Sequence, residues 1–145
     1  MLVQQILGDK AIGGIVMLTS SDTVADAARL MSEKRIGTVV ISDDGGKTPH
    51  GILSERDIVR ELGAAGPGCL SRKVGEMMTR NPKTCVPADH SVKILSTMTE
   101  GRFRHMPVMQ DGALIGLVSI GDVVKGRLSE LAAERDALQG MIMGY

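Results

Sequence analysis

Two short segments of the chain pair a serine with an aspartate three residues later, a spacing that suits phosphate and ribose binding. Ser54 and Asp57 form the first pair, and Ser119 and Asp122 form the second. Each serine would stand at the N-cap of a helix, with its aspartate about one turn in on the same side. Free backbone N–H groups and the helix dipole then favour a phosphate. The hydroxyl can donate to a phosphate oxygen, and the carboxylate can accept from a ribose hydroxyl pair.

The same spacing also has a purely structural interpretation. A serine at the N-cap with an acidic residue at the third helical position is close to a capping box, which stabilises a helix without any ligand. If the pattern occurred only once, the structural interpretation would be favoured. A serine that caps a helix can, however, also bind a ligand. The spacing by itself therefore leaves both interpretations open.

Each pair belongs to a longer string that occurs twice in the chain. Residues 51–57 and 116–122 both read glycine, two apolar residues, serine, two variable residues and aspartate. Upstream, residues 16–18 match 84–86 as short β-type runs, and Asp22-Thr23-Val24 match His90-Ser91-Val92. A copy of about 60 residues would bury little surface alone. We therefore expect two copies that pack together around a pseudo-twofold axis.

The pattern of each copy predicts the order β-α-β-β-α, an α/β (α+β) class, with the last two strands joined as a hairpin. One helical turn is expected at 3–7 and at 74–78, before each copy. Val24, Ala27 and Met31 form an apolar helix face, which Val92, Leu95 and Met98 repeat more thinly. The expected helices are 23–34 and 91–100, the expected strands are 37–41, 51–53, 105–109 and 116–118, and the glycine-rich segment 63–68 is expected to be a linker.

The end of the chain carries a stripe that has no counterpart in the first copy. Its members are spaced 4-3-4-3-4, which predicts an amphipathic helix of perhaps 20 residues. The helix would pack on a partner subunit or back across its own module, and the pattern favours the partner. We expect copy one at 1–66, copy two at 67–127 and a helical tail at 128–145. The stripe consists of Val124, Leu128, Leu131, Arg135, Leu138 and Ile142.

Composition excludes several classes of function. The formal net charge is zero, which argues against nucleic-acid and acidic-membrane binding, because both need a basic surface. Phe103 and Tyr145 are the only aromatic residues, too few for a platform that stacks bases. Cys69 and Cys85 lack metal or redox spacing, and no apolar run reaches the roughly 20 residues of a membrane span. Residues 1–10 lack the features of a signal peptide, so we expect a cytoplasmic protein with reduced thiols and no metal site.

The ordered set of short strings resembles the tandem cystathionine-β-synthase (CBS) domain proteins of the stand-alone bacterial type. The resemblance spans about residues 3–125. It implies a regulatory module that binds AMP, ADP, ATP, NAD(H) or S-adenosylmethionine in clefts between the repeats, and a homodimer. The strings that carry it are Asp22-Thr23-Val24 with Ala27-Ala28, Arg35-Ile36-Gly37, 51–57, Arg102-Phe103-Arg104-His105-Met106-Pro107-Val108 and 116–122.

The resemblance also assigns roles to residues and favours ligand binding by the two Ser–Asp pairs. It implies that Asp57 and Asp122 bind ribose and that Ser54 and Ser119 bind phosphate. Arg104 and His105 form a plausible phosphate clamp. We align this clamp with Ile36-Gly37 of copy one, so the two sites should be unequal. The candidates for the adenine pocket are Thr19, Ile36, Thr84, Val86 and Met106, although core packing is an alternative role for most of them.

These observations lead to one preferred function and two alternatives. The preferred function is a non-catalytic sensor of adenine nucleotides that signals through dimer packing to a partner protein in trans. An enzyme is disfavoured because the sequence has no nucleophile–base pair, metal set or Walker-type loop. The third hypothesis is a structural dimerisation module whose ligand sites have degenerated.

Overall fold

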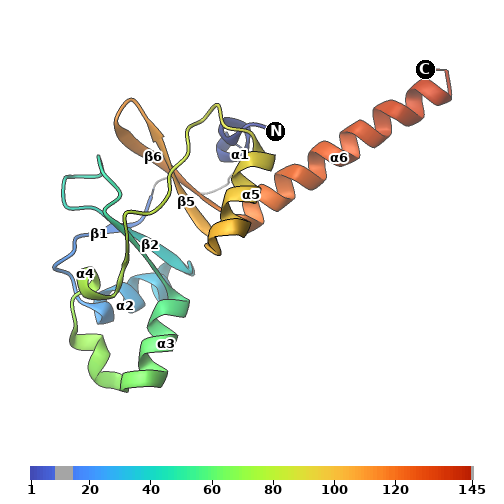
Figure 1. Cartoon of the computed structure of the whole chain (residues 1–145). Coiled ribbons are helices and arrows are strands. Elements are labelled where there is room, and N and C mark those ends of the chain that lie inside the picture. The colour runs from blue at the N-terminus through green and yellow to red at the C-terminus, as the bar shows by residue number, and fades with distance from the viewer. Residues whose placement is uncertain (9–14, 145) are drawn as a thin grey trace.

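The fold consists of two repeats and a long C-terminal helix, as the sequence predicts; the first repeat has the order β-α-β-β-α, and in the second the first strand is reduced to a single bridge. The computed structural model describes residues 1–8 and 15–144 and is shown in Figure 1. In chain order the elements are α1 (Val3–Gly8), β1 (Met17–Leu18), α2 (Val24–Lys34), β2 (Thr38–Ile41), β3 (Gly51–Ser54), α3 (Glu55–Ala65), the 3-10 helix η1 (Pro67–Ser71), α4 (Val74–Met77), β4 (Thr79–Arg80), α5 (Ser91–Gly101), β5 (His105–Gln110), β6 (Ala113–Ser119) and α6 (Ile120–Ile142).

The two expected hairpins are present. Strands β2 and β3 pair antiparallel, and so do β5 and β6. Asp111 and Gly112 in the β5–β6 turn both have positive φ, as the type I′ turn of a tight hairpin requires. Strand β1 runs parallel to β2, and β4 extends the first sheet beyond β3. In the second copy the run 84–86 forms only an isolated parallel bridge between Cys85 and Val108.

The structure corrects the register between the two copies by one residue. Thr23 and His90 are the N-caps of α2 and α5, so Ser91 corresponds to Val24 and not to Thr23. The sequence match had placed the hydroxyls of Thr23 and Ser91 together, but His90 Nδ1 accepts from the backbone N–H of Val92 at 3.2 Å and caps the helix instead. The apolar face of α5 shifts accordingly: its buried residues are Ser91, Ile94 and Met98.

The same shift changes the equivalents of the predicted phosphate clamp. Thr38 pairs with Ser54 in the first hairpin, and His105 pairs with Ser119 in the second. Because the two serines are equivalent, His105 corresponds to Thr38. Arg104 therefore corresponds to Gly37, and the alignment of the clamp with Ile36-Gly37 is wrong by one position.

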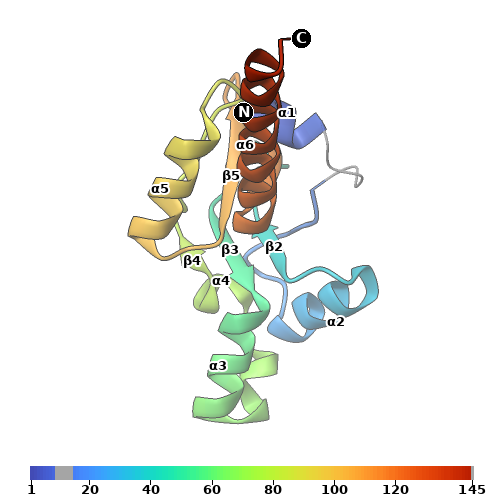
Figure 2. The ribbon, with the colours of Figure 1, turned by 90° about the vertical axis from the view of Figure 1, so that its right-hand side faces the viewer.

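The short helix before each copy packs on the other copy. The backbone N–H of Val3 in α1 donates to Asp89 O at 2.9 Å, and that of Val74 in α4 donates to Asp22 O at 2.8 Å. Helix α1 thus enters the core of the second copy, and α4 enters the core of the first. Figures 1 and 2 show α1 beside the start of α6 and α4 beside the first sheet. The two copies are therefore interlocked.

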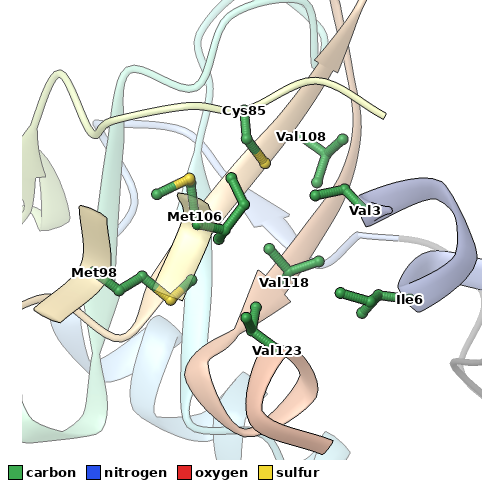
Figure 3. Close-up of a cluster of buried hydrophobic side chains, with 9 residues drawn as sticks. Val3, Ile6, Cys85, Met98, Met106, Val108, Val118 and Val123 are labelled. Atoms are coloured by element: carbon green, nitrogen blue, oxygen red, sulfur yellow. The ribbon is translucent and has the colours of Figure 1, made fainter. Parts of the chain in front are cut away.

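Each copy has its own hydrophobic core. Figure 3 shows the core of the second copy, which joins α1 to α5, β5, β6 and the start of α6. Methionine and β-branched residues make up most of its buried members, and Phe103 packs against it from the edge. The buried members are Val3, Ile6, Cys85, Ile94, Met98, Met106, Val108, Val118 and Val123.

The predicted linker at 63–68 is mostly helical. Helix α3 continues to Ala65, Gly66 ends it with a φ of 78°, and η1 follows at once. Cys69 in η1 is buried. The segment 63–68 itself is largely exposed, and contacts of η1 with α2 and α3, including buried Cys69, hold it in place although its glycine-rich composition by itself indicates a loop.

Helix α6 is a single 23-residue helix that extends away from the body of the molecule (Figure 1). Its first turns pack against α1 and α5, where Val123 and Gly126 are buried. Beyond them Leu138 is 60% exposed and Ile142 is 84% exposed. The distal half of the stripe therefore does not pack back across its own module. Among the described residues no helix is both long enough and apolar enough to cross a membrane.

Candidate functional site

Both Ser–Asp pairs form capping boxes. The Ser54 hydroxyl accepts from the backbone N–H of Asp57 at 3.3 Å, and Asp57 Oδ2 accepts from the backbone N–H of Ser54 at 2.9 Å. The second pair repeats this arrangement, with 3.0 Å to the Ser119 hydroxyl and 2.9 Å to Asp122 Oδ2. Both carboxylates are half-buried. The structural interpretation of the spacing is therefore correct, and each box also presents a hydroxyl and a carboxylate at the start of a helix.

A backbone hydrogen bond ties each helix start to the residue just before the first strand of its hairpin. The N–H of Glu55 donates to Gly37 O at 2.9 Å, and the N–H of Ile120 donates to Arg104 O at 2.7 Å. These bonds fix Gly37 beside the N-terminus of α3 and Arg104 beside the N-terminus of α6. Each helix start is thus assembled from two strands of its own copy.

Thr38 and His105 connect the two helix starts. Thr38 Oγ1 lies 3.3 Å from His105 Nδ1, although the residues are 67 positions apart in the chain. They are equivalent residues, so a contact between them lies at the pseudo-twofold axis of the module. Thr38 is buried and His105 is half-buried.

A cavity of about 320 Å³ lies beside this contact, and both Thr38 and His105 line it. It brings together three of the predicted site residues: Ser119, His105 and Ile36. Most of its wall is apolar, as an adenine ring requires, and the polar residues Ser119, His105 and Thr38 also line it. The lining residues are Leu7, Ile15, Val16, Ile36, Gly37, Thr38, His105, Ile115, Gly116, Leu117 and Ser119. Asp122 stands directly behind Ser119 through the capping box.

The other predicted site residues lie outside this wall. Arg104 is exposed, and only its backbone is placed by a contact, the bond to Ile120. Thr19 is exposed, and its hydroxyl bonds to Ser21 and Asp22. The two other outward-facing candidates, Thr84 and Val86, are also exposed.

Two further predictions concern the interior and the first copy. Met106, a candidate for the adenine pocket, is 1% exposed and belongs to the core of the second copy. Ser54 and Asp57 stand at the α3 start, where Asp57 Oδ1 also pairs with Arg60 Nη1 at 3.5 Å. The structure thus separates the two predicted ribose carboxylates into two different surroundings.

Several cavity residues gave no signal in the sequence. Leu7 lines the cavity because α1 packs on the second copy. No local sequence pattern predicts that α1 packs there. Ile15 and Val16 precede β1 and reach the cavity only because β1 lies beside β2. Ile115 was detectable in principle, since its position in β6 alternates with buried Leu114 and Gly116.

A second cavity of about 310 Å³ has a different, more polar lining. His50 Nδ1 there accepts from the backbone N–H of Asp43 at 3.1 Å. A hydrogen bond from the backbone N–H of Ser20 holds the pKa of Asp43 below its usual value. The other lining residues are Lys73, Gly75, Glu76, Met78, Arg80 and Asn81, and this wall contains none of the predicted site residues. Within the described part of the chain no cluster of residues could hold a metal ion.

Comparison with known proteins identifies relatives over most of the chain. The profile of the CBS domain matches residues 11–64 and 74–129. The chain is 36% identical over 145 residues to the CBS domain-containing protein CBSX3, mitochondrial, of Arabidopsis thaliana, and covers 70% of that protein. It spans only 22% of the longer Arabidopsis protein CBSCBSPB2, to which it is 31% identical.

Solved structures show the same fold. The CBS-domain containing protein ATU1752 from Agrobacterium tumefaciens is 35% identical, with a TM-score of 0.81 over 88% of this chain and 99% of that one. PAE2072 from Pyrobaculum aerophilum, complexed with AMP, is 25% identical, with a TM-score of 0.77 over 92% and 99%. The hexameric CBS-CP12 protein from bloom-forming cyanobacteria is 28% identical, with a TM-score of 0.74 over 86% and 69%.

Proposed function

Because this chain belongs to the CBS domain family, we propose that it is a non-catalytic regulatory module that binds an adenosine ligand in the cavity beside Ser119 and Asp122. The observation that carries the proposal is the cavity itself: an apolar wall that ends in a serine and a histidine at a capped helix N-terminus. Stand-alone CBS domain proteins are typically regulatory and not catalytic. The AMP complex of PAE2072 supports a ligand of this class.

In the proposed complex each part of an adenosine ligand meets a suitable group. The adenine ring lies against apolar residues such as Val16 and Ile36. The Asp122 carboxylate accepts from the ribose hydroxyls, and Ser119 donates to a 5′-phosphate together with His105 and Arg104. The backbone N–H of Gly121 adds a donor to the same phosphate, whereas the N–H groups of Ile120 and Asp122 are already bonded to Arg104 O and to the Ser119 hydroxyl.

The experiment that tests the proposal has two arms. Mass spectrometry of small molecules released from the denatured protein identifies any ligand that copurifies. Isothermal titration with AMP, ADP, ATP, NADH and S-adenosylmethionine then measures affinity after that ligand is removed. Binding of at least one adenosine compound is expected. If none of the five gives heat or raises the unfolding temperature, the proposal fails.

The proposed assembly is a homodimer that uses the exposed stripe of α6. The stripe residues Leu128, Leu131, Leu138 and Ile142 are 42–84% exposed in the single chain. Their spacing is that of a coiled-coil seam, which Arg135 interrupts. The hexamer formed by the CBS-CP12 protein supports self-association as a property of such modules.

A second function, structural dimerisation with degenerate ligand sites, is favoured by one observation. Both capping boxes are complete without a ligand. This alternative predicts a stable dimer that does not respond to any adenosine compound. Both functions predict a dimer, but only the regulatory function predicts ligand binding. The titrations above therefore separate the two.

A further inference from the structure

The second, more polar cavity lies at the other end of the first hairpin from the first cavity. Strands β2 and β3 pair from Thr38 and Ser54 at one end to Ile41 and Gly51 at the other. Thr38 lines the first cavity, whereas His50, which directly precedes Gly51, lines the second. The two walls have no residue in common. We call the second cavity, of about 310 Å³, the β3-start cavity.

Among the described residues, two cations in the wall of the β3-start cavity have no carboxylate partner. Lys73 lies just before α4, and its ammonium takes part in no hydrogen bond or ion pair there. Arg80 lies in β4 opposite Gly51, and its guanidinium donates from Nη2 to the backbone carbonyl of Gly75 at 3.1 Å. Both side chains are exposed, so their charges are available to a ligand.

The two carboxylates of the same wall are already bonded to other groups. Asp43 Oδ1 accepts from the backbone N–H of Ser20 at 2.8 Å. Glu76 pairs with Arg72 at 3.3 Å, and Arg72, which does not line the cavity, also pairs with Glu61 at 3.5 Å. The formal charges of the wall sum to zero, but the carboxylates have partners, whereas the ammonium and the guanidinium have no anion beside them.

The uncharged polar groups of the wall add hydrogen-bond donors. His50 Nδ1 accepts from the backbone N–H of Asp43 at 3.1 Å, so Nδ1 carries no hydrogen and the neutral imidazole donates only from Nε2. The Ser20 hydroxyl and the Asn81 amide can also donate, and both residues line the cavity. Phosphate and carboxylate oxygens accept hydrogen bonds from such groups and pair with Lys and Arg. The wall therefore suits an anion.

The second copy shows that the fold does not require these charges. The bond from Gly75 N–H to Ser20 O at 3.1 Å is repeated there by the bond from Gln4 N–H to Pro87 O at 3.0 Å. The two hairpins correspond through Gly51 and Gly116, which fixes the other equivalents. A ligand thus accounts for the charged wall better than folding does, because the equivalents of Lys73, Glu76 and His50 are the uncharged residues Leu2, Gln5 and Ile115.

We propose that the β3-start cavity binds a small polyanion, a molecule with two or more phosphate or carboxylate groups, between Lys73, Arg80 and His50. Its volume of about 310 Å³ is at the lower end of the range for small-molecule sites. The two cations come from different segments, so each can hold one anionic group. This site is separate from the adenosine cavity and does not depend on the proposed function.

Histidine NMR of the full chain tests the proposal, because the protein has three histidines in three different places. His50 lines the β3-start cavity, His105 lines the first cavity, and His90 lines neither. Titration with pyrophosphate, and separately with citrate, should shift the imidazole C–H resonances of His50 and leave those of His90 unchanged. The tighter of the two probes identifies a phosphorylated or a carboxylate ligand. Inorganic phosphate should bind about tenfold more weakly than the tighter probe.

Variants of the two cations give the second readout. Lys73→Gln and Arg80→Gln should each weaken the tighter probe about tenfold, as followed at His50, because each removes a charged contact to the ligand. Lys83→Gln is the matched control, since it removes the same charge from an exposed lysine outside the wall. Its affinity should stay within about threefold of the wild-type value. Thermal unfolding verifies that all three variants fold.

Several outcomes overturn the proposal. It fails if neither polyanion shifts the His50 resonances, if inorganic phosphate binds as tightly as both, or if Lys73→Gln and Arg80→Gln bind no more weakly than Lys83→Gln. A shift at His105 alone would place the probe in the first cavity, which contradicts the proposal and leaves the proposed function intact. Conversely, a wild type that binds polyanions at His50 but no adenosine compound would refute only the proposed function.

Discussion

Thr38 and His105 occupy the same position in the two copies and touch each other, with 3.3 Å between Thr38 Oγ1 and His105 Nδ1. Each pairs with the capping serine of its own hairpin, Ser54 and Ser119 respectively. The contact therefore joins the two helix starts at the centre of the module. A ligand phosphate at Ser119 would approach the same imidazole that Thr38 contacts, which couples ligand binding to the packing of the two copies.

The Thr38–His105 contact is expected to stabilise the module. Thr38→Val keeps the shape of the buried side chain and removes the hydroxyl, so the free energy of unfolding should fall by about 0.5–1.5 kcal/mol. His105→Ala should have a similar effect on this interaction. Urea unfolding of both single variants and the double variant gives the coupling energy, which should be about 0.5–1 kcal/mol. A coupling energy of zero would show that the two side chains act independently.

Asp122→Asn should weaken binding of an adenosine ligand about ten- to hundredfold, because a charged acceptor for the ribose hydroxyls is lost. Asp57→Asn is the matched control, with the same change in the equivalent capping box. Because neither Ser54 nor Asp57 lines the cavity beside Ser119, Asp57→Asn should alter AMP affinity less than threefold. Isothermal titration of both variants measures the difference, and equal losses would contradict the assignment of the ligand to that cavity.

Ser91→Ala should stabilise the protein. Ser91 is fully buried, and within the described residues its hydroxyl has no hydrogen-bond partner, whereas the equivalent position in the first copy carries Val24. Removal of an unsatisfied buried hydroxyl should raise the free energy of unfolding by about 1 kcal/mol and the melting temperature by about 2–4 °C. Ser96→Ala, at an exposed position of the same helix, should change stability by less than about 0.5 kcal/mol. A destabilised Ser91→Ala would point to a partner such as bound water.

Cys85 should make stability fall at alkaline pH. Burial raises the pKa of its thiol from 9.0 to about 12 in the folded protein. Below pH 9 the thiol is protonated in both states; above it only the unfolded thiol ionises, so the unfolding free energy should fall by up to about 1.4 kcal/mol per pH unit. The loss should continue as pH rises toward about 12. The difference between wild type and Cys85→Ala in chemical denaturation across this range isolates the effect, and parallel curves would contradict it.

Leu138→Asp should dissociate the proposed dimer without unfolding the module. Leu138 is 60% exposed on the distal part of α6, so the charge costs little in the single chain and would be buried in an interface. Sedimentation velocity should show a shift from dimer to monomer, while circular dichroism stays unchanged. Ala137→Asp, one position off the stripe, is the control and should remain dimeric. A monomeric wild type, or a dimeric Leu138→Asp, would rule out this interface.

The fold could be predicted well from sequence where the signals are local. The hairpin at Asp111-Gly112 follows from two residues that tolerate positive φ, and the boxes at Ser54 and Ser119 follow from a three-residue spacing. The one-residue register error in the second copy arose because Ser91 looks like a helix cap. Whether a serine caps a helix or is buried under it depends on packing. In this helix His90 is the N-cap residue and Ser91 is buried.

The candidate site was predictable only in part, for a related reason. Ser119, His105 and Ile36 were named from motifs, and all three line the cavity. Met106 was assigned to the adenine pocket but is part of the core, because alternation along β5 turns it inward. An apolar strand residue in a repeat of this size can face either a ligand or the core, and the sequence does not distinguish the two.

The sequence by itself determined two copies of one β-α-β-β-α unit, with a capped helix after each hairpin and an apolar stripe on the final helix. These features depend on residues that are only a few positions apart, so the local sequence is sufficient to predict them. The tertiary structure alone decided that α1 crosses to the second copy, that Leu7 and Val16 complete the cavity, and that Thr38 meets His105. Those relationships depend on which distant surfaces fit together, and they form the cavity in which an apolar wall from both copies meets Ser119 and His105.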